Sequence, residues 1–512
     1  MTSPDTADIV IPFDNSYARL PDRFFVRQHP TPVSAPGLIR INDALARDLG
    51  IDPAALASPA GIAVLAGNRI AQGSAPIAAA YAGHQFGGFS PALGDGRAIL
   101  LGEVIGKDGI RRDIQLKGSG PTPWSRRGDG RAALGPVLRE YIVSEAFAAL
   151  GIPTTRALAA VTTGDVVQRE TPMPGGVLAR VAASHIRVGT FQYFAARQDV
   201  DAVRILADHV IARHYPDAAA AAHPYRALLD GVVAGQASLI AQWMLVGFIH
   251  GVMNTDNCQV AGETIDFGPC AFMDAYHPDT VFSSIDRNGR YAFASQPAIA
   301  HWNLVRFAET LLPLLGDDQD SAVAAAQAAL DPFAGQFEAA YGAGLRRKIG
   351  LAPTPSFVVG EDTALIRELF DLMATGHADF TLTFRRLADA AVEPAANQDS
   401  AADPAADTAF AALFSGGVDP TPWLAQWRSR LATDPVMPAE RRTQMRGVNP
   451  LYIPRNHRIE QAIAAAVGQG DFGPFHTLVD VLAKPFDDQP AFANLAEPPA
   501  AHEIVQETFC GT

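Results

Sequence analysis

The chain has 512 residues, of which 48% are hydrophobic and 18% are charged, and its formal net charge is −14. This composition supplies ample apolar surface for a core and excludes a chain that is disordered throughout. The acidic balance argues against non-specific binding to nucleic acid or to an anionic membrane. Three cysteines are too few for a disulfide scaffold. Length alone suggests roughly three domain-sized units.

The N-terminal residues 1–8 lack the basic and apolar segments of a secretory signal. An apolar stretch at 231–255 carries no formal charge, but polar residues such as Gln236, Gln242 and Asn254 interrupt it. This pattern favours a buried helix that runs into a polar loop over a membrane-spanning helix. We therefore expect a cytoplasmic protein without a membrane or nucleic-acid partner.

The first predicted elements alternate between irregular and regular segments. Residues 9–60 begin as a proline-containing lead-in and continue into a helix at 42–50, with Asn42 as its cap and Gly50 as its stop. A glycine-dense run at 81–97 follows. Strands are expected at 98–105 and 112–117, joined by a turn at 106–109, so that they form a hairpin with Lys117 at its end.

The later elements become mostly helical. A helix is expected at 134–150, and strands are expected at 157–162, 165–169 and 176–181. From about residue 200 the spacing of apolar residues is mostly typical of helices. Residues 390–408 are of low complexity and predict an inserted loop.

Two features in the β-rich part are typical of phosphate binding. Gly94 and Gly96 precede Arg97, and glycines let backbone N–H groups approach phosphate oxygens while arginine adds a fork of donors. Lys117 ends a strand and Glu140 lies on the next helix, which suits a lysine that grips phosphates and a carboxylate that orients it. Taken alone, each feature is more often a simple turn or a solvated surface charge.

Two further motifs follow the apolar helix: HGVMNTDN at 250–257 and DFG at 266–268. In protein kinases, an asparagine of the catalytic loop and the aspartate of the D-F-G motif hold the metal. Asn257 and Asp266 would supply hard oxygen ligands of the kind that suit Mg²⁺. Each motif is weak by itself, but all occur in the order found in kinases. The sequence therefore predicts an α+β, protein-kinase-like bilobal fold.

In this fold a small β-rich N-lobe with one key helix would precede a large helical C-lobe, with extensions at both ends. The predicted domains are an N-terminal extension at 1–75, an N-lobe with the nucleotide loop at 76–182, a C-lobe with the metal and catalytic residues at 183–389, a low-complexity loop at 390–408, and a helical C-terminal region at 409–512 that ends in Cys510.

One position departs from the kinase pattern. If Asn257 is the metal ligand, the catalytic base should lie five residues earlier, where this chain has Val252. Valine cannot accept a proton, whereas Asp256 lies directly beside Asn257. The chain thus looks like a pseudokinase that retains its phosphate and metal ligands.

Several longer strings span nearly the whole chain: FDNSYARLP at 13–21, YAGHQFG at 81–87, LGDGRA at 93–98, QLKGSG at 115–120, RRGDGRA at 126–132, HGVMNTDN at 250–257 and NPLYIPRNHR at 449–458. Together they resemble the SelO (YdiU) family of protein adenylyltransferases. The resemblance implies a kinase-like fold that binds ATP in a flipped orientation. AMP, rather than phosphate, would then move to a Ser, Thr or Tyr hydroxyl of a protein substrate, and pyrophosphate would leave.

The resemblance also implies roles for individual residues. Asp256 would be the proton acceptor, Glu140 would orient Lys117, and Asn257 and Asp266 would bind Mg²⁺ or Mn²⁺. The nucleotide would contact Gly94, Gly96, Arg97, Lys117, Asp129, Gly130, Arg180, Arg187 and Asp266. Arginines concentrated at one site would give an acidic protein a local positive field, although several of them could equally form surface ion pairs. Arg126 and Arg127 are the weakest candidates.

Three other functions remain open at this stage: a kinase that transfers the γ-phosphate with Asp256 as base, a nucleotide-binding scaffold without activity, and a uridylyltransferase that uses UTP. His84 and His250 lack the paired spacing of a zinc site, so structural hydrogen bonding is expected for both. The family resemblance includes a redox-active C-terminal position. It suggests that Cys510 forms a reversible disulfide with Cys270, although three reduced thiols are an equally good expectation in a cytoplasm.

Overall fold

The computed structural model describes residues 9–352, 360–391 and 404–509. The strands are β1 (Phe25–Arg27), β2 (Gly37–Ile41), β3 (Ile77–Ala79), β4 (Gly83–Gln85), β5 (Gly88–Ser90), β6 (Ala98–Ile105), β7 (Arg111–Lys117), β8 (Ala132–Ala133), β9 (Arg156–Gln168), β10 (Pro172–Ala182), β11 (Phe248–Ile249) and β12 (Ala271–Phe272). The helices are α1 (Asp43–Asp48), α2 (Pro53–Ala57), α3 (Pro59–Leu65), α4 (Leu134–Ala149), α5 (Val188–Ala195), α6 (Val200–His214), α7 (Pro224–Leu245), α8 (Gln296–Leu315), α9 (Gln319–Leu330), α10 (Phe333–Lys348), α11 (Glu361–Thr375), α12 (Phe380–Ala390), α13 (Pro404–Ala411), α14 (Thr421–Ala432), α15 (Pro438–Arg446), α16 (Asn456–Gln469) and α17 (Gly473–Leu482).

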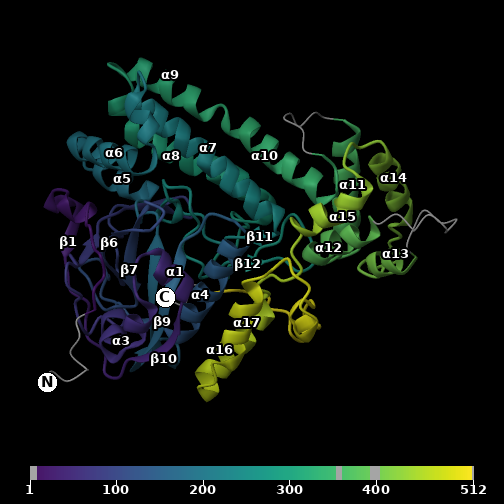
Figure 1. Ribbon diagram of the computed structural model, residues 1–512. Coiled ribbons are helices and arrows are strands. Elements are labelled where there is room, and N and C mark those ends of the chain that lie inside the picture. Colours follow the sequence, from purple (N-terminus) through teal and green to yellow (C-terminus); the bar gives the residue numbers. More distant parts are fainter. Residues whose placement is uncertain (1–8, 353–359, 392–403, 510–512) are drawn as a thin grey trace.

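The main sheet is antiparallel, with strand order β1-β3-β6-β7-β10-β9-β2 and with β8 beside β10 (Figure 1). The predicted hairpin is confirmed as β6 and β7, whose register pairs Ala98 with Lys117. Both edge strands, β1 and β2, come from the N-terminal segment. The strands expected at 157–162 and 165–169 are one continuous strand, β9. Gly164 adopts a φ of +73° within it, a conformation that glycine tolerates without a break in the strand.

Helix α4 connects the sheet to the rest of the molecule. It packs against β9 and β10 and also contacts α16 and α17 (Figure 1). Near its C-terminal end the ring of Phe147 lies 4.5 Å from that of Phe248 and 5.2 Å from that of Phe267. These edge-to-face contacts join α4 to the segment that contains the D-F-G motif. The expected helix at 134–150 is therefore confirmed, and its position brings Glu140 to the interior.

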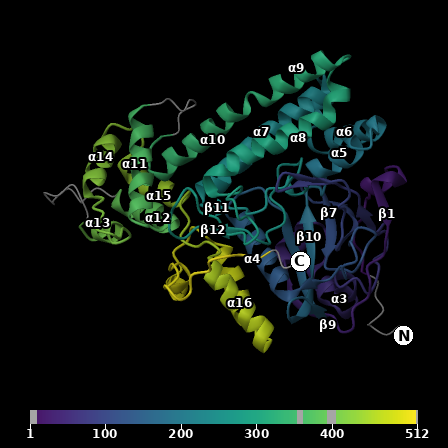
Figure 2. The ribbon, with the colours of Figure 1, turned by 180° about the vertical axis from the view of Figure 1, so that it is seen from behind.

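Helices α7, α8, α9 and α10 form the long helical part beside the sheet (Figure 2). The apolar stretch at 231–255 does fold as a helix that ends at Leu245 and leads into a polar loop, as expected. Within the described residues, α7 is the one helix that is long and apolar enough to cross a membrane, but 61% of its most apolar window is buried. Its packing against α8 and α10 accounts for its apolar character.

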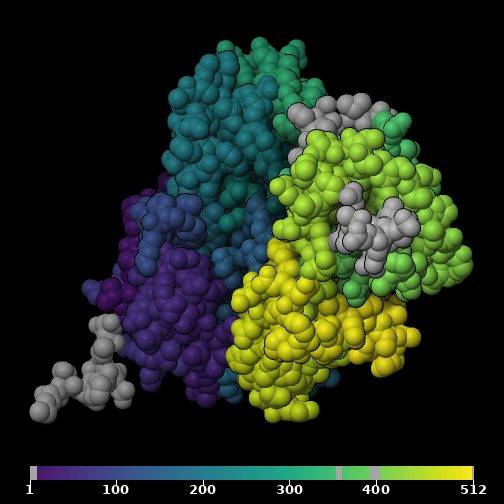
Figure 3. Space-filling view, turned by 45° about the vertical axis from the view of Figure 1, so that its right-hand side comes forward, coloured from purple at the N-terminus to yellow at the C-terminus, as the bar shows by residue number. Residues whose placement is uncertain are grey.

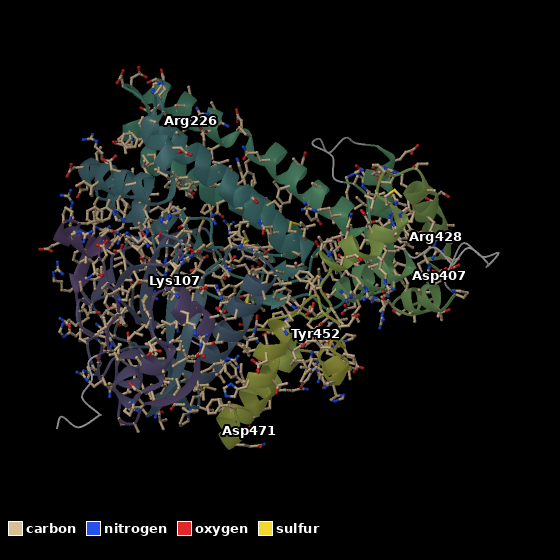
Figure 4. The ribbon with its side chains drawn as sticks, in the orientation of Figure 1. Lys107, Arg226, Asp407, Arg428, Tyr452 and Asp471 are labelled. Carbon is tan, nitrogen blue, oxygen red and sulfur yellow. The ribbon has the colours of Figure 1, made fainter. Side chains whose placement is uncertain are left out.

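The prediction of a loop at 390–408 is wrong at the C-terminal end of that range. Residues 392–403 lie outside the described residues, whereas 404–408 belong to helix α13. Figure 4 shows Asp407 of α13 and Arg428 of α14 pointing toward one another, and Arg428 Nη1 donates to Asp407 Oδ2 at 3.0 Å. This ion pair and the buried ring of Phe410 attach α13 to its neighbours, which the low-complexity pattern conceals.

The C-terminal region packs against both the sheet-bearing part and the helices, as its yellow surface shows in Figure 3. After α17 the chain returns to the D-F-G segment, where the Thr508 hydroxyl donates to the Pro269 carbonyl at 2.5 Å. The Cys270 thiol is buried and donates to the Phe267 carbonyl. Cys510 lies outside the described residues, so its proposed pairing with Cys270 remains a prediction.

Lys348 at the end of α10 is a buried cation, 3% exposed, and burial lowers its pKa to about 7. The unfolded chain therefore binds more protons than the folded chain between that value and the ordinary pKa of about 10.5, so this residue makes stability rise with pH across that window. Its ammonium lies 4.3 Å from the centroid of the Phe384 ring. This cation–π contact offsets part of the free-energy cost of burying the charge.

We expect Lys348→Met to raise the free energy of unfolding by about 2 kcal/mol near pH 7 and by less near pH 9.5. Urea denaturation of both proteins at the two pH values measures this difference. A variant that is destabilised, or whose gain does not change with pH, would contradict the assignment.

Candidate active site

Three cations converge on one carboxylate next to the main sheet. Lys117 ends β7 and its Nζ lies 2.8 Å from Asp266 Oδ1, while Arg180 of β10 donates to the same oxygen at 2.8 Å. Arg187, just before α5, reaches Asp266 Oδ2 at 3.3 Å. We call Lys117, Arg180 and Arg187 the cation cluster. The structure thus brings together four of the predicted site residues, although they are spread over about 150 positions of the sequence.

Glu140 of α4 is the second anion of this group. Its carboxylate lies 2.5 Å from Lys117 Nζ and 3.0 Å from Arg180 Nη1. The antiparallel register also places Arg180 opposite Gln115, whose Oε1 accepts from Arg180 Nη2 at 2.7 Å. The predicted contact between Lys117 and Glu140 therefore exists, and Arg180 shares it.

The surroundings of Asp266 fix its charge. Burial alone would raise the pKa of this carboxyl, but the cation cluster holds it well below its ordinary value. Its backbone adopts a φ of +64°, which is uncommon for a residue other than glycine and costs about 1 kcal/mol. The ion pairs with the cation cluster offset that strain.

Asp256 lies in the loop that follows β11 and is 7% exposed. Its Oδ2 accepts from Gln85 Nε2 at 3.1 Å, whereas the buried Oδ1 has no hydrogen-bond partner among the residues that the structure describes. Burial raises the pKa of this carboxyl to about 6, although the nearby guanidinium of Arg187 acts in the opposite direction. Arg187 Nη1 also donates to the Asp256 carbonyl at 2.7 Å, which ties this loop to the cation cluster.

Asn257 presents an oxygen suited to a metal ion. Its Nδ2 donates to the Val252 carbonyl at 3.0 Å, which leaves Oδ1 as the side-chain atom available for a ligand. Asn257 and Asp266 together offer two hard oxygen donors, and this set fits a metal such as Mg²⁺ that takes its remaining ligands from phosphate and water. No group of three or more His, Cys, Asp or Glu side chains with metal-binding geometry occurs in the described ranges.

The glycine turn before β6 is held by close contacts. Gly94 has a φ of +62°, and a Cβ at this position would lie 2.2 Å from the Trp124 ring. A Cβ at Gly96 would lie 2.9 Å from the Trp124 carbonyl. The half-buried Arg97 guanidinium makes no hydrogen bond or ion pair with any residue in the described part of the chain. The turn is thus tightly fixed, and its arginine is available for a ligand.

The 121–131 segment contains the remaining predicted residues. Asp129 is half-exposed, and its carboxylate pairs with Arg169 at 3.0 Å. Its partner in the described residues is therefore not one of the three residues of the cation cluster. Gly130 has a φ of +64°. It packs so closely on Gly120 that a Cβ added to Gly130 would lie 2.1 Å from the Gly120 carbonyl oxygen. Arg126 and Arg127 are exposed.

Several polar residues of the site were missed in the sequence. Asp95, 3% exposed, accepts from the Ala79 N–H at 3.0 Å and from Gln115 Nε2 at 3.3 Å, so it fastens the glycine turn to the sheet. Gln85 contacts Asp256, and Arg187 lies 4.6 Å from the Tyr81 ring centroid. The only signal for these residues was their place within the glycine-dense run.

The two histidines follow their expected structural roles. His250 Nε2 lies 2.9 Å from the Ile265 carbonyl and its ring stacks on Trp243. His84 Nδ1 lies 2.8 Å from Gln192 Nε2. Both imidazoles therefore have hydrogen-bond partners within the fold.

A mixed α/β chain with a buried cation cluster around one aspartate has the features of an enzyme that handles a polyphosphate. A family model described as "Protein adenylyltransferase SelO" matches residues 9–483. The chain belongs to this family, and its class is that of the protein nucleotidyltransferases.

Curated relatives match over nearly the full length of both chains. A protein of Methylorubrum extorquens named protein nucleotidyltransferase YdiU is 64% identical over 506 residues, which cover 98% of this chain and 99% of the relative. Proteins of the same name from a Bradyrhizobium species and from Rhodopseudomonas palustris are 64% and 62% identical, with the same coverage.

Proposed function

We propose that this chain transfers AMP from ATP to Ser, Thr or Tyr hydroxyls of protein substrates and releases pyrophosphate. The observation that carries the proposal is the convergence of the cation cluster on Asp266 beside the buried carboxylate of Asp256. Family membership supports the same conclusion, because the matching family model is that of a protein adenylyltransferase.

We also propose a kinase-like division of the chain. Residues 76–182 would form the N-lobe, with Lys117 on its strand and Glu140 on its helix, and residues 183–389 would form the C-lobe. The contact between Lys117 and Glu140 and the D-F-G segment next to it support this division. The segments 1–75 and 409–512 would be extensions, of which the first supplies two edge strands to the sheet.

Asn257 Oδ1 and the Asp266 carboxylate are the groups that would hold Mg²⁺ or Mn²⁺. When bound, such an ion supplies charge neutralisation and polarises phosphate oxygens. Lys117, Arg180 and Arg187 would neutralise the negative charge of the triphosphate and of the departing pyrophosphate. Arg97 would add donors from the glycine turn, where its guanidinium has no described partner.

Asp256 would accept the proton of the attacking hydroxyl. The hydroxyl oxygen forms a bond to the α-phosphorus, its proton passes to Asp256, and the bond from the α-phosphorus to the bridging oxygen breaks. Pyrophosphate leaves with that electron pair. A carboxyl whose pKa is about 6 is mostly ionised at neutral pH and yet basic enough for this step.

Incubation with ATP labelled on either the α- or the γ-phosphate tests the proposal. We expect the α-label on protein and no γ-label. Transfer of the γ-label would instead identify a kinase, and transfer of neither label would identify a nucleotide-binding scaffold. Competition of unlabelled ATP against labelled UTP then distinguishes adenylyl from uridylyl transfer.

A further inference from the structure

The hairpin β4–β5 covers the loop that carries Asp256. Its residues contact that loop in succession. The His84 N–H donates to Thr255 Oγ1 at 2.7 Å, Gln85 Nε2 donates to Asp256 Oδ2 at 3.1 Å, and the Phe86 N–H donates to Asn254 Oδ1 at 3.1 Å. Two of these three bonds use the hairpin backbone, so they depend on the path of the chain rather than on side-chain type. Gln85 alone contributes a side chain, and it contacts the proposed proton acceptor.

Glycines allow this close approach. A Cβ at Gly83 would lie 2.4 Å from Asp256 Oδ1, so a residue with a side chain would displace the carboxylate. A Cβ at Gly189 would lie 2.1 Å from the Ala82 carbonyl oxygen, and the Ala82 N–H donates to the Gly189 carbonyl at 2.9 Å. The start of the hairpin is therefore packed directly on the Asp256 side chain and on the first turn of α5.

Side chains around the hairpin hold the rest of the loop. The Thr255 hydroxyl donates to Gln192 Oε1 at 2.6 Å, and the Gln192 amide contacts His84. The Tyr291 hydroxyl donates to Asn254 Oδ1 at 2.7 Å. The backbone of the loop thus has anchors that do not involve Gln85. Loss of the Gln85 amide would free the Asp256 carboxylate without releasing the loop.

We propose that Gln85 is a positioning residue that fixes the Asp256 carboxylate for proton transfer, an inference that rests on the proposed function. The Gln85 amide holds Oδ2. The buried Oδ1 lies against Gly83, so the hairpin holds both oxygens of the carboxylate. Gln85 thus acts only through Asp256.

This role predicts that Gln85 affects turnover and not nucleotide affinity. Lys117, Arg180 and Arg187 lie on other elements, and they contact Asp266 rather than Gln85. Loss of a hydrogen bond to a charged group lowers the rate of the step that depends on it by about 10- to 100-fold. The KM for ATP should stay within about twofold of its original value.

Two variants separate positioning from packing. Gln85→Leu removes the donor and keeps similar bulk. Gln85→Glu keeps both shape and polarity but replaces the donor by a second carboxylate against Asp256. Phe89→Leu is the matched control, because Phe89 lies on the same hairpin, is 43% exposed and packs on the His84 ring instead of on Asp256.

The measurement is the kcat and the KM for ATP in transfer of the α-label, together with the melting temperature of each variant. We expect both Gln85 variants to lose about 10- to 100-fold in kcat at an unchanged KM, while Phe89→Leu retains its kcat. A kcat that survives in either Gln85 variant would overturn the inference, as would an equal loss in Phe89→Leu. Absence of transfer by the unaltered chain would overturn the proposed function together with the inference, so the two failures are distinguishable.

Discussion

Replacement of Asp266 by asparagine is expected to reduce AMP transfer by at least about a hundredfold and to destabilise the folded chain. The side chain keeps its shape, but the shared counter-ion of Lys117, Arg180 and Arg187 disappears. Glu140 then remains as the carboxylate that pairs with Lys117 and Arg180, whereas Arg187 loses its ion pair. Unpaired buried charges of this kind cost about 3–5 kcal/mol.

The same substitution should change how ATP stabilises the protein. The triphosphate supplies negative charge that replaces the lost carboxylate. ATP in the presence of a metal chelator should therefore raise the melting temperature of Asp266→Asn by more than it raises that of the unaltered chain. Asp108→Asn is the control, because Asp108 forms an exposed ion pair with Arg112, and such a pair contributes about 0–1 kcal/mol. If the Asp266→Asn variant kept full transfer activity, Asp266 would have no role in the reaction.

Replacement of Asp256 by asparagine is expected to lower kcat by about 10²- to 10⁴-fold without weakening ATP binding. An amide cannot take the proton of the acceptor hydroxyl, although its oxygen can still accept from Gln85. Arg187 contacts the Asp256 carbonyl in addition to Asp266, so the substitution preserves that backbone link. The melting temperature should not fall, because a buried carboxylate with an unpartnered oxygen is replaced by a neutral group of the same size.

Single-turnover transfer of the α-label measures the loss in rate, and calorimetric titration measures the affinity for ATP. A large loss of ATP affinity in Asp256→Asn would place this residue among the nucleotide ligands. Retention of the original transfer rate would require a different proton acceptor.

The local elements of the fold were accessible from the sequence because their periodicity is local. Alternation of polar and apolar residues predicted the hairpin that ends at Lys117, and helical spacing predicted α4 with Glu140. Motif order singled out Lys117 and Asp266, whose side chains meet in the structure. These are signals that neighbouring residues carry by themselves.

Strand pairing and side-chain contacts between distant segments could not be predicted from the sequence in the same way. The edge strand β1 has three residues, too few for an alternating pattern, and it is defined by its partner β3 some fifty positions later. Gln85 and Asp95 also gave no signal of their own. Their importance comes from Asp256, Ala79 and Gln115, which approach them only in the folded chain.

The environment of helix α4 fixes the position of Glu140. Every residue from Val137 to Ser144 is buried, which covers two full turns and hence all sides of the helix. On the side away from the sheet, Arg139 pairs with Glu460 of α16 and the Tyr141 ring packs edge-to-face on Phe475 of α17. An outward swing of this helix would have to expel two C-terminal helices first. The packing of α16 and α17 on α4 therefore holds the Glu140 carboxylate in place against Lys117.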